Sequence, residues 1–335
     1  MSRLPPVTSD AAAPRDHVRA AVSAATPYPH ATPPRRIGAV PAREDNPPVP
    51  IRHMDFGFDR QPLQRYFYDG NAFASAFYMA FSAVIPQGER FFIHSVRHYR
   101  DRINDPELDA RVTGFIGQEA MHGKEHDAVN EAYEKMGFRL GLIDRNVREA
   151  LKLLAKTLSK PAQLAFTVAL EHYTAIISEF MLTHPEVRAK FEPTVGNFIF
   201  WHMMEETEHK AVAFDVYEKC VGSYALRAGV MIPTTVVLIA ALANLQFYLL
   251  TNDKQRPRKG RWRDTLRGFA AIYGPRGLFG SVAPKLLDYF RPGFHPNDHD
   301  TRALLAEFRE QFFGAQGELN EQLKKTVTPQ ARAAA

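Results

Sequence analysis

Residues 118–126, QEAMHGKEH, place two glutamates and two histidines within nine positions of a stretch that is helical in character. In a helix, Glu119 and His122 are three positions apart and therefore lie on the same face. Carboxylates and imidazoles bind metal ions, but a single helix cannot enclose an ion. The stretch therefore indicates either a solvated helix face or part of a metal site whose other ligands lie elsewhere in the chain.

Three other stretches with helical character offer such ligands. WHMMEETEH (201–209) repeats the Glu-x-x-His spacing at Glu206 and His209. Glu89, in PQGERFF, comes 30 residues before the first Glu-x-x-His step, and Glu171, in VALEHYT, comes 35 residues before the second. The chain thus shows the same order twice, with a glutamate among apolar residues followed by Glu-x-x-His.

This repeated order predicts a site for two metal ions. Four helices packed side by side can each direct one of these groups inward. Four carboxylates carry a formal charge of −4, which two divalent cations neutralise while coordination positions stay open. A carboxylate-rich set with few imidazoles suits iron or manganese better than a zinc hydrolase site. The predicted metal ligands are Glu89, Glu119, His122, Glu171, Glu206 and His209.

The remainder of the sequence is typical of an all-α protein. Apolar residues recur at helical spacing over long stretches, and none alternates with period two over a useful length. The single cysteine, Cys220, excludes an intramolecular disulfide and a cysteine-based zinc site. The predicted helices lie within residues 71–103, 105–138 (with an Asp105 cap and Pro106 in the first turn), 145–158, 160–184 and 187–222.

The stretches PQGERFF, GFIGQEAMHGKEH, ALEHYTA and WHMMEETEHKAVAFDVY resemble the ferritin-like di-iron carboxylate superfamily. Within that superfamily they are similar to a bacterial family commonly labelled "predicted metal-dependent hydrolase". The resemblance covers about residues 55–310. It implies a ferritin-like four-helix bundle with extra C-terminal helices. It also implies that Glu89 and Glu171 are terminal ligands, Glu119 and Glu206 bridging ligands, and His122 and His209 the imidazole ligands.

The predicted ligands and the family label favour different reactions. Because di-iron carboxylate sites mostly activate O2, we expect a monooxygenase or oxidase that holds two irons, or manganese, and oxidises a small aromatic or acyl substrate. Such an O2-dependent oxidoreductase needs an electron donor, either a reductase or a ferredoxin. Two alternatives stay open: a hydrolase that uses a metal-bound hydroxide, and an iron-binding protein without catalysis. The sequence identifies neither the substrate nor any catalytic residue beyond the ligands.

Other polar residues lie close to the predicted ligands. His126 follows His122 by one turn and His202 precedes Glu206 by one turn, so each is a candidate for an extra ligand or for a group that supports one. Glu205 and Glu208 are expected to point about 100° away from the ligand face and to be solvated or ion-paired. Candidates for holding the ligating imidazoles in place are Glu125, His172 and Glu179.

The first 50 residues differ from the predicted metal-binding bundle at 55–225. They contain 11 of the 24 prolines and almost no large apolar residues. Such a segment cannot bury enough apolar surface to offset the entropy lost on ordering, so we predict a disordered tail.

A predicted apolar helix follows the bundle at 226–253. Its core, residues 228–250, carries no charge over 23 positions, which is enough to cross a bilayer. KQRPRKGRWR (254–263) adds six cations and opens a basic segment with C-terminal helices, 254–335. Three interpretations stay open: membrane association without spanning, burial in a soluble protein or a dimer, and a true span.

A true span would place the metal bundle on the side of the membrane opposite to the basic segment, where iron is hard to load and reduce. The expected location is therefore the cytoplasm, with the inner face of the membrane as a candidate contact. The expected partners are a small-molecule substrate and the electron donor. An anionic membrane surface and a second copy of the chain are further candidates. A nucleic acid is not expected, because the basic segment lacks a recognisable binding module.

Overall fold

The computed structural model describes residues 46 and 48–331. Most of the predicted disordered tail lies outside these residues. The described part is mainly helical, which confirms the predicted all-α class.

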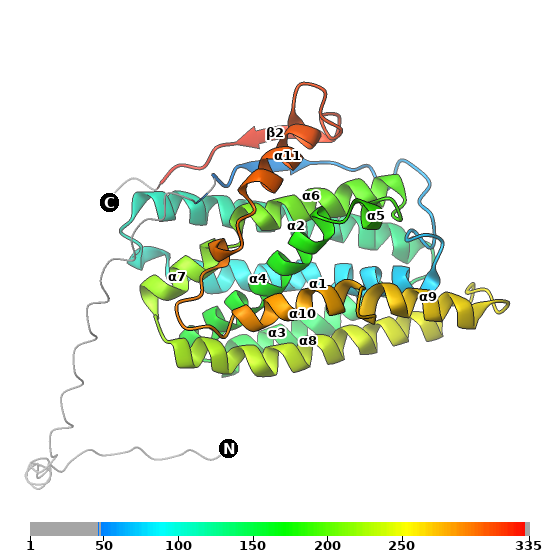
Figure 1. The fold of residues 1–335 in the computed structure, drawn as a ribbon, viewed down its shortest axis with the longest axis horizontal. Helices are drawn as coiled ribbons and strands as arrows, with labels where there is room; N and C mark the ends of the chain where they lie inside the picture. Colours follow the sequence, from blue (N-terminus) through cyan, green and yellow to red (C-terminus); the bar gives the residue numbers. More distant parts are fainter. Residues whose placement is uncertain (1–45, 47, 332–335) are drawn as a thin grey trace, which may run out of the picture. The chain divides into compact units, whose positions relative to one another are not determined.

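Four helices surround the centre of the described part (Figure 1). They are α1 (Ala72–Arg97), α2 (Pro106–Lys135), α4 (Lys160–Leu182) and α6 (Pro193–His209). Helix α1 packs against α2 and α4, and α6 packs against the same two helices, so the four form a closed ring of neighbours. Each of the four sequence stretches that carry predicted ligands lies on one of these helices.

Local sequence explains where the helices begin. The Asp105 side chain accepts hydrogen bonds from the backbone N–H groups of Glu107 and Leu108, and Pro106 occupies the first turn of α2, as predicted. The prediction of one helix over 187–222 is wrong. Pro193 lacks a backbone N–H and starts a new helix, so the segment contains α5 (Pro185–Arg188), α6 and α7 (Val212–Cys220).

Further helices cover this centre. Helix α3 (Leu140–Thr157) packs on α1 and α2, and α8 (Tyr224–Asn252) packs on α1 and α4. Helix α9 (Arg261–Tyr273) lies on α1, α10 (Leu278–Asp288) on α4, and α11 (Arg302–Phe313) on α6. Two short 3₁₀ helices are η1 (Arg100–Arg102) and η2 (Pro296–Asp298).

A two-stranded antiparallel sheet joins the two ends of the described chain. Strand β1 (Ile51–Met54) pairs with β2 (Leu323–Val327), with Ile51 opposite Val327 and Met54 opposite Leu323. Strand β1 also lies along α2. The sequence did not predict this sheet, because strands of four and five residues are too short for a period-two pattern to stand out.

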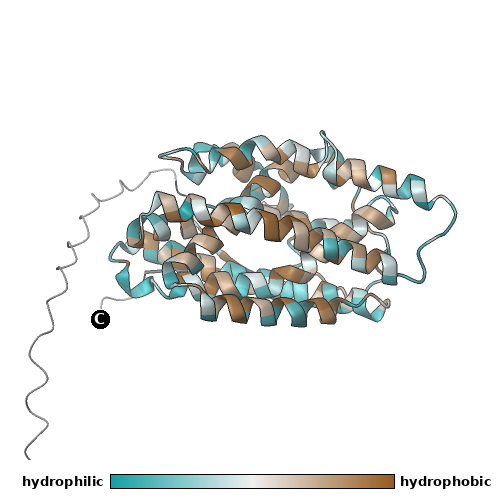
Figure 2. Ribbon diagram, turned by 90° about the horizontal axis from the view of Figure 1, so that it is seen from below, coloured by the Kyte–Doolittle hydropathy of each residue, from teal (hydrophilic) through white to brown (hydrophobic). Residues whose placement is uncertain are grey.

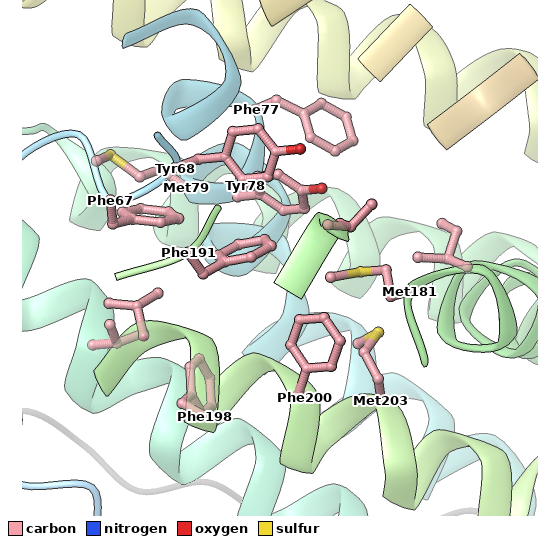
Figure 3. Packing of buried hydrophobic residues seen from close by; sticks show 14 of the residues in the cluster. Phe67, Tyr68, Phe77, Tyr78, Met79, Met181, Phe191, Phe198, Phe200 and Met203 are labelled. Carbon is pink, nitrogen blue, oxygen red and sulfur yellow. The ribbon is translucent and has the colours of Figure 1, made fainter. Parts of the chain in front are cut away.

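Aromatic rings and methionines fill the core beside the four central helices (Figure 3). Phe191 lies between Tyr68 and Tyr78, with ring centroids at 4.9 and 4.8 Å in edge-to-face geometry. Such pairs add to the stability gained from apolar burial. Phe191 follows α5, so its packing anchors the connection that leads into α6.

Helix α2 packs closely against the segment before β1, and this contact leads to a prediction about the free energy of unfolding. A Cβ atom on Gly114 would lie 2.1 Å from the backbone oxygen of Val49, whereas a Cβ on Gly229, in α8, would meet nothing within 4 Å. We expect Gly114→Ala to lower the free energy of unfolding by about 1–3 kcal/mol through overpacking. Gly229→Ala, the matched control, should raise it by about 0.5–1 kcal/mol through helix propensity. Urea unfolding followed by circular dichroism measures both, and equal effects would contradict the packing described.

Candidate metal centre

The structure brings the six predicted ligands to one buried place. Glu89 lies on α1, Glu119 and His122 on α2, Glu171 on α4, and Glu206 and His209 on α6. None of the six residues is more than 2% exposed. Because charged groups are rarely buried so completely unless they are paired or bind metal, this arrangement needs a physical explanation.

The first group of potential ligand atoms contains His202 in addition to predicted residues. One ligand atom from each of four residues lies within 4.8 Å of the others. His122 Nδ1 is 3.7 Å from both Glu89 Oε1 and Glu206 Oε1. His202 Nε2 is 2.9 Å from Glu206 Oε1 and 3.5 Å from Glu89 Oε1. The residues of the first group are Glu89, His122, His202 and Glu206.

The second group is centred on His209. Its Nε2 atom is 3.2 Å from Glu119 Oε1, 3.4 Å from Glu206 Oε2 and 3.7 Å from Glu171 Oε2. The two carboxylate oxygens of Glu206 therefore face different groups, Oε1 the first and Oε2 the second. This is the position of a carboxylate that could bridge two ions. Glu119, the other residue expected to bridge, belongs to the second group alone.

Hydrogen bonds fix the orientation of two imidazoles. His209 Nδ1 lies 2.9 Å from Gln118 Oε1, an amide oxygen that can only accept, so Nδ1 carries a proton and Nε2 is the ring nitrogen that faces the carboxylates. The Gln118 amide is oriented in turn by its Nε2, which donates to Glu208. His122 Nε2 lies 3.0 Å from Glu205 Oε2, which leaves Nδ1 to face the first group.

A chain of hydrogen bonds orients the third imidazole. The Ser82 hydroxyl donates to Asn130 Oδ1, so Ser82 Oγ accepts its other bond, at 2.8 Å, from His126 Nδ1. His126 Nε2 must then accept from His202 Nδ1, again at 2.8 Å. The other ring nitrogen of His202, Nε2, faces Glu206 and Glu89. The two candidate histidines thus differ: His202 joins the cluster, and His126 supports it.

The unpaired polar atoms of this centre fit a bound cation. Nine buried side-chain atoms of the six predicted ligands have no hydrogen-bond partner among the described residues. They are both carboxylate oxygens of Glu89, Glu119 and Glu171, together with Glu206 Oε2, His122 Nδ1 and His209 Nε2. Buried polar atoms are normally satisfied. Their convergence therefore fits divalent cations, whose positive charge and coordination bonds would supply the missing interactions.

The pKa values agree with this interpretation. Burial raises the pKa of Glu119 to about 7 and the pKa values of Glu89 and Glu171 well above the ordinary range. Burial opposes a charge on His209 as well, but Glu206 and Glu119 outweigh it and raise the pKa of its ring well above the usual value. Without a cation, protons therefore compensate the charge of the carboxylates.

A network of buried ion pairs lies directly behind the imidazoles. Arg52, on β1, donates to Glu205 at 2.7 Å and to both oxygens of Glu208 at 2.8 Å. Arg309, on α11, donates to Glu208 at 2.6 Å. The expectation that Glu205 and Glu208 are ion-paired is therefore confirmed. The alternative, that they are solvated, is wrong, because β1 and α11 cover them.

The remaining candidates for supporting residues lie apart from the imidazoles. Glu125 pairs with Lys124, His172 bonds to the backbone oxygen of Lys285, and Glu179 bonds to Lys285 and His299. The sequence analysis missed Arg52 and Gln118, which act through Glu205 and His209. Gln118 directly precedes Glu119 and could have been considered, but no local signal connects Arg52 to residues 153 positions away.

An apolar cavity adjoins the first group. Its internal volume is about 40 Å³, and residues of α1, α2, α4 and α6 form most of its lining. Aromatic, aliphatic and methionine side chains form most of its wall, and several of them are drawn in Figure 3. Its polar lining consists of Ser82, His126, Asn130 and His202, the members of the hydrogen-bonded chain. The cavity and the potential metal ligands thus share the His202 ring.

A family model described as "Predicted metal-dependent hydrolase" matches residues 50–300. The chain belongs to this family. The match includes all six predicted ligands, Arg52 and the cavity. No curated protein and no solved structure matches the chain. The resemblance to the ferritin-like superfamily accordingly stays a prediction, whereas membership of the predicted hydrolase family is a finding.

Family membership overturns the expected reaction class. The predictions of an O2-dependent oxidoreductase and of a monooxygenase are wrong, because the family is one of predicted metal-dependent hydrolases. The error has a physical origin. Carboxylates and imidazoles define what a site can bind, but the same donors hold cations that act as Lewis acids and cations that change oxidation state. The buried cluster supports metal binding, without specifying iron or O2.

The unpaired carboxylates predict opposite effects on the metal-free and metal-loaded protein. Glu89→Gln and Glu171→Gln each remove a buried carboxylate, so the metal-free melting temperature should rise, by about 2–4 °C for each kcal/mol gained. Both variants should lose most of the stabilisation that added Mn²⁺ or Zn²⁺ gives. Thermal unfolding with and without chelator, and elemental analysis, measure these effects. Exposed Glu149→Gln is the control, and unchanged metal content in both variants would contradict the ligand assignment.

The buried ion pairs of Arg52 lead to a second prediction about stability. Arg52→Ala leaves the Glu205 and Glu208 carboxylates buried without this partner, and breaking such a buried network costs about 3–5 kcal/mol of unfolding free energy. Arg60→Ala removes an exposed pair with Asp55 and should leave stability unchanged within error. Chemical unfolding of both variants tests the difference. If Arg52→Ala and Arg60→Ala lowered the unfolding free energy by similar amounts, the ion pairs of Arg52 would not be what holds β1 on α6.

Proposed function

We propose that the protein is a metal-dependent hydrolase that cleaves small carboxylic esters or amides with an apolar acyl group. One observation carries the proposal: unpaired carboxylate and imidazole atoms converge beside a cavity with an almost entirely apolar wall. The family description supports the reaction class. The cavity supports the substrate class, since an apolar acyl chain is what such a wall can desolvate without leaving polar groups unpaired.

Seven residues would hold two divalent cations. They are the six predicted ligands and His202, whose Nε2 atom faces Glu206 and Glu89. Four carboxylates balance the charge of two such ions, and Glu206 would lie between them. Manganese, ferrous iron and zinc all accept this mixture of oxygen and nitrogen donors. When bound, such a cation supplies Lewis-acid polarisation of a carbonyl group and lowers the pKa of water.

The protein's own groups would position the substrate and the protons. Glu205 and Gln118 hold the rings of His122 and His209 so that the other ring nitrogen of each faces inward, which keeps the donor atoms in place before binding. The cavity wall excludes water from the acyl chain. The chain from His202 through His126 to Ser82 would hold the His202 ring in place, because each contact spans 2.8 Å, and it would present polar groups at the cavity wall.

Reconstitution tests the proposed reaction. Protein stripped by chelation and reloaded separately with Mn²⁺, Fe²⁺ or Zn²⁺ is assayed with p-nitrophenyl esters of increasing acyl length, in air and under argon. We expect hydrolysis that requires metal, is equal with and without O2, and favours acyl chains over acetate. Glu206→Ala should lose most bound metal and activity. Metal binding with no hydrolysis across ester, amide and phosphoester panels would contradict the proposal.

The cavity predicts the chain-length preference. Ile199→Phe adds volume to the wall and should raise KM for the longer esters by about tenfold, roughly the effect of one or two excluded methylene groups, with little change for acetate. Leu153→Phe, at an exposed position of α3, is the control. Metal content should be unchanged in both variants. Equal kinetics of Ile199→Phe and the parent enzyme on all esters would place the substrate outside this cavity.

A further inference from the structure

The exposed large apolar side chains lie almost entirely in one layer of helices. Of eleven such residues among those described, ten lie on α8, α9 or α10, and the other is Leu153 on α3. These three helices cover the same two central helices, since α8 packs on α1 and α4, α9 on α1, and α10 on α4. Helix α8 runs along the lower edge of Figure 1, and Figure 2 views the protein from that side.

The buried side of helix α8 includes several polar side chains, whereas most of its exposed side is apolar. Gln246 is buried, donates to the backbone oxygen of Phe73 and accepts from Tyr273. Thr234 is also buried. The outward positions from 229 to 247 include a single polar side chain, Asn244, and the large residues there are Ile232, Val236, Val237, Ile239 and Phe247. A helix of a soluble protein normally shows the opposite pattern.

The exposed apolar face continues into a cluster of cations. The segment 254–263 carries six Lys and Arg residues and no Asp or Glu. Five of the six, all except Arg256, are exposed. Trp262 lies within the cluster and is 63% exposed. Apolar side chains next to Lys, Arg and an exposed Trp are the composition of surfaces that contact the interface of an anionic bilayer.

We propose that the outer face of α8, together with the basic segment 254–263, binds the surface of an anionic lipid bilayer. Apolar side chains such as Phe247 would enter the interfacial region, and the cations would contact lipid phosphates. The protein would lie on the membrane without crossing it. This inference is independent of the proposed hydrolase activity, because none of these residues belongs to the metal centre or the cavity.

The inward contacts of α8 argue against a span. It is the one helix among the described residues long and apolar enough to cross a bilayer. A spanning α8 would have to leave α1 and α4 and expose its buried polar groups to lipid, at a high cost in free energy. Gln246 would lose its partners, and so would Arg227, whose guanidinium donates to the backbone oxygen of Tyr289 at 2.6 Å.

Charge argues for lipid over a second copy of the chain. A two-fold dimer through this face would bring the cluster at 254–263 near its own copy or leave it at the rim of the interface. If the two clusters lay near each other, their like charges would repel. If they lay at the rim of the interface, the apolar face of the other copy would offer the cations no opposite charge. An anionic bilayer satisfies both parts of the surface at once. The dimer is therefore the outcome that would overturn the proposal.

Vesicle flotation tests this surface. Metal-loaded protein is mixed with phosphatidylcholine vesicles, with or without the anionic lipid phosphatidylserine, at low and high salt. We expect strong binding to the anionic vesicles that weakens with salt, and weak binding to the neutral ones. Arg258→Gln, Lys259→Gln, Arg261→Gln and Arg263→Gln combined should weaken anionic binding by about 1000-fold. Phe247→Ser with Val237→Ser should weaken binding to both vesicle types.

Matched variants at α3 test whether lipid binding depends on this surface in particular or on any exposed cation or apolar side chain. One control variant removes four exposed cations on or near α3 by combining Arg139→Gln, Arg145→Gln, Lys152→Gln and Lys156→Gln. A second control, Leu153→Ser, removes the exposed large apolar residue of that helix. These should bind vesicles like the parent protein. All variants should keep their metal content and melting temperature. Absence of binding to anionic vesicles at low salt, or a stable dimer by analytical ultracentrifugation that Phe247→Ser with Val237→Ser dissociates, would overturn the proposal.

Discussion

The metal centre depends on burying four carboxylates in the middle of a helical protein where few of their oxygens meet a hydrogen-bond donor. Such burial is unfavourable unless protons or cations neutralise the charge. Among the described residues, the raised pKa values of Glu119 and His209 favour their protonated forms, and these protons compensate the carboxylate charge. A bound cation would replace those protons. The four central helices are therefore arranged around a site whose stability would be linked to metal binding.

The groups behind the imidazoles turn that cluster into an ordered site. Gln118 and Glu205 each fix one ring nitrogen as a donor, and the Ser82–His126–His202 chain does the same for a third ring. Arg52 connects this layer to β1, which pairs with β2 near the other end of the described chain. The short sheet, which at first sight is peripheral, is thus coupled to the orientation of the ligands.

The expected oxygenase activity and the family finding differ for an instructive reason. Ligand spacing reports which atoms can meet around an ion, and here it located a buried cluster that can hold one. Reaction class depends on what the cation does to a substrate, and on the cavity that holds the substrate beside it. Neither property is encoded in the Glu-x-x-His spacing. An apolar cavity that shares His202 with the cluster is compatible with the proposed hydrolysis of acyl compounds, and the family description supports hydrolysis without naming a substrate.

The helical class, the Asp105 cap with Pro106 in the first turn of α2, and the candidate ligands could all be predicted from the sequence, because helical periodicity and i, i+3 spacing are local properties. The sequence could not determine that His202 joins the cluster while His126 supports it, since that depends on a hydrogen-bonded chain between α1, α2 and α6. Nor could it connect Arg52 with Glu205, because that contact depends on how β1 folds over the helices. For residues 228–250, composition left membrane association, burial in a soluble protein or a dimer, and a true span open. Tertiary packing decided which side of α8 faces inward: Gln246 and Thr234 are buried, so the face left to the solvent is apolar.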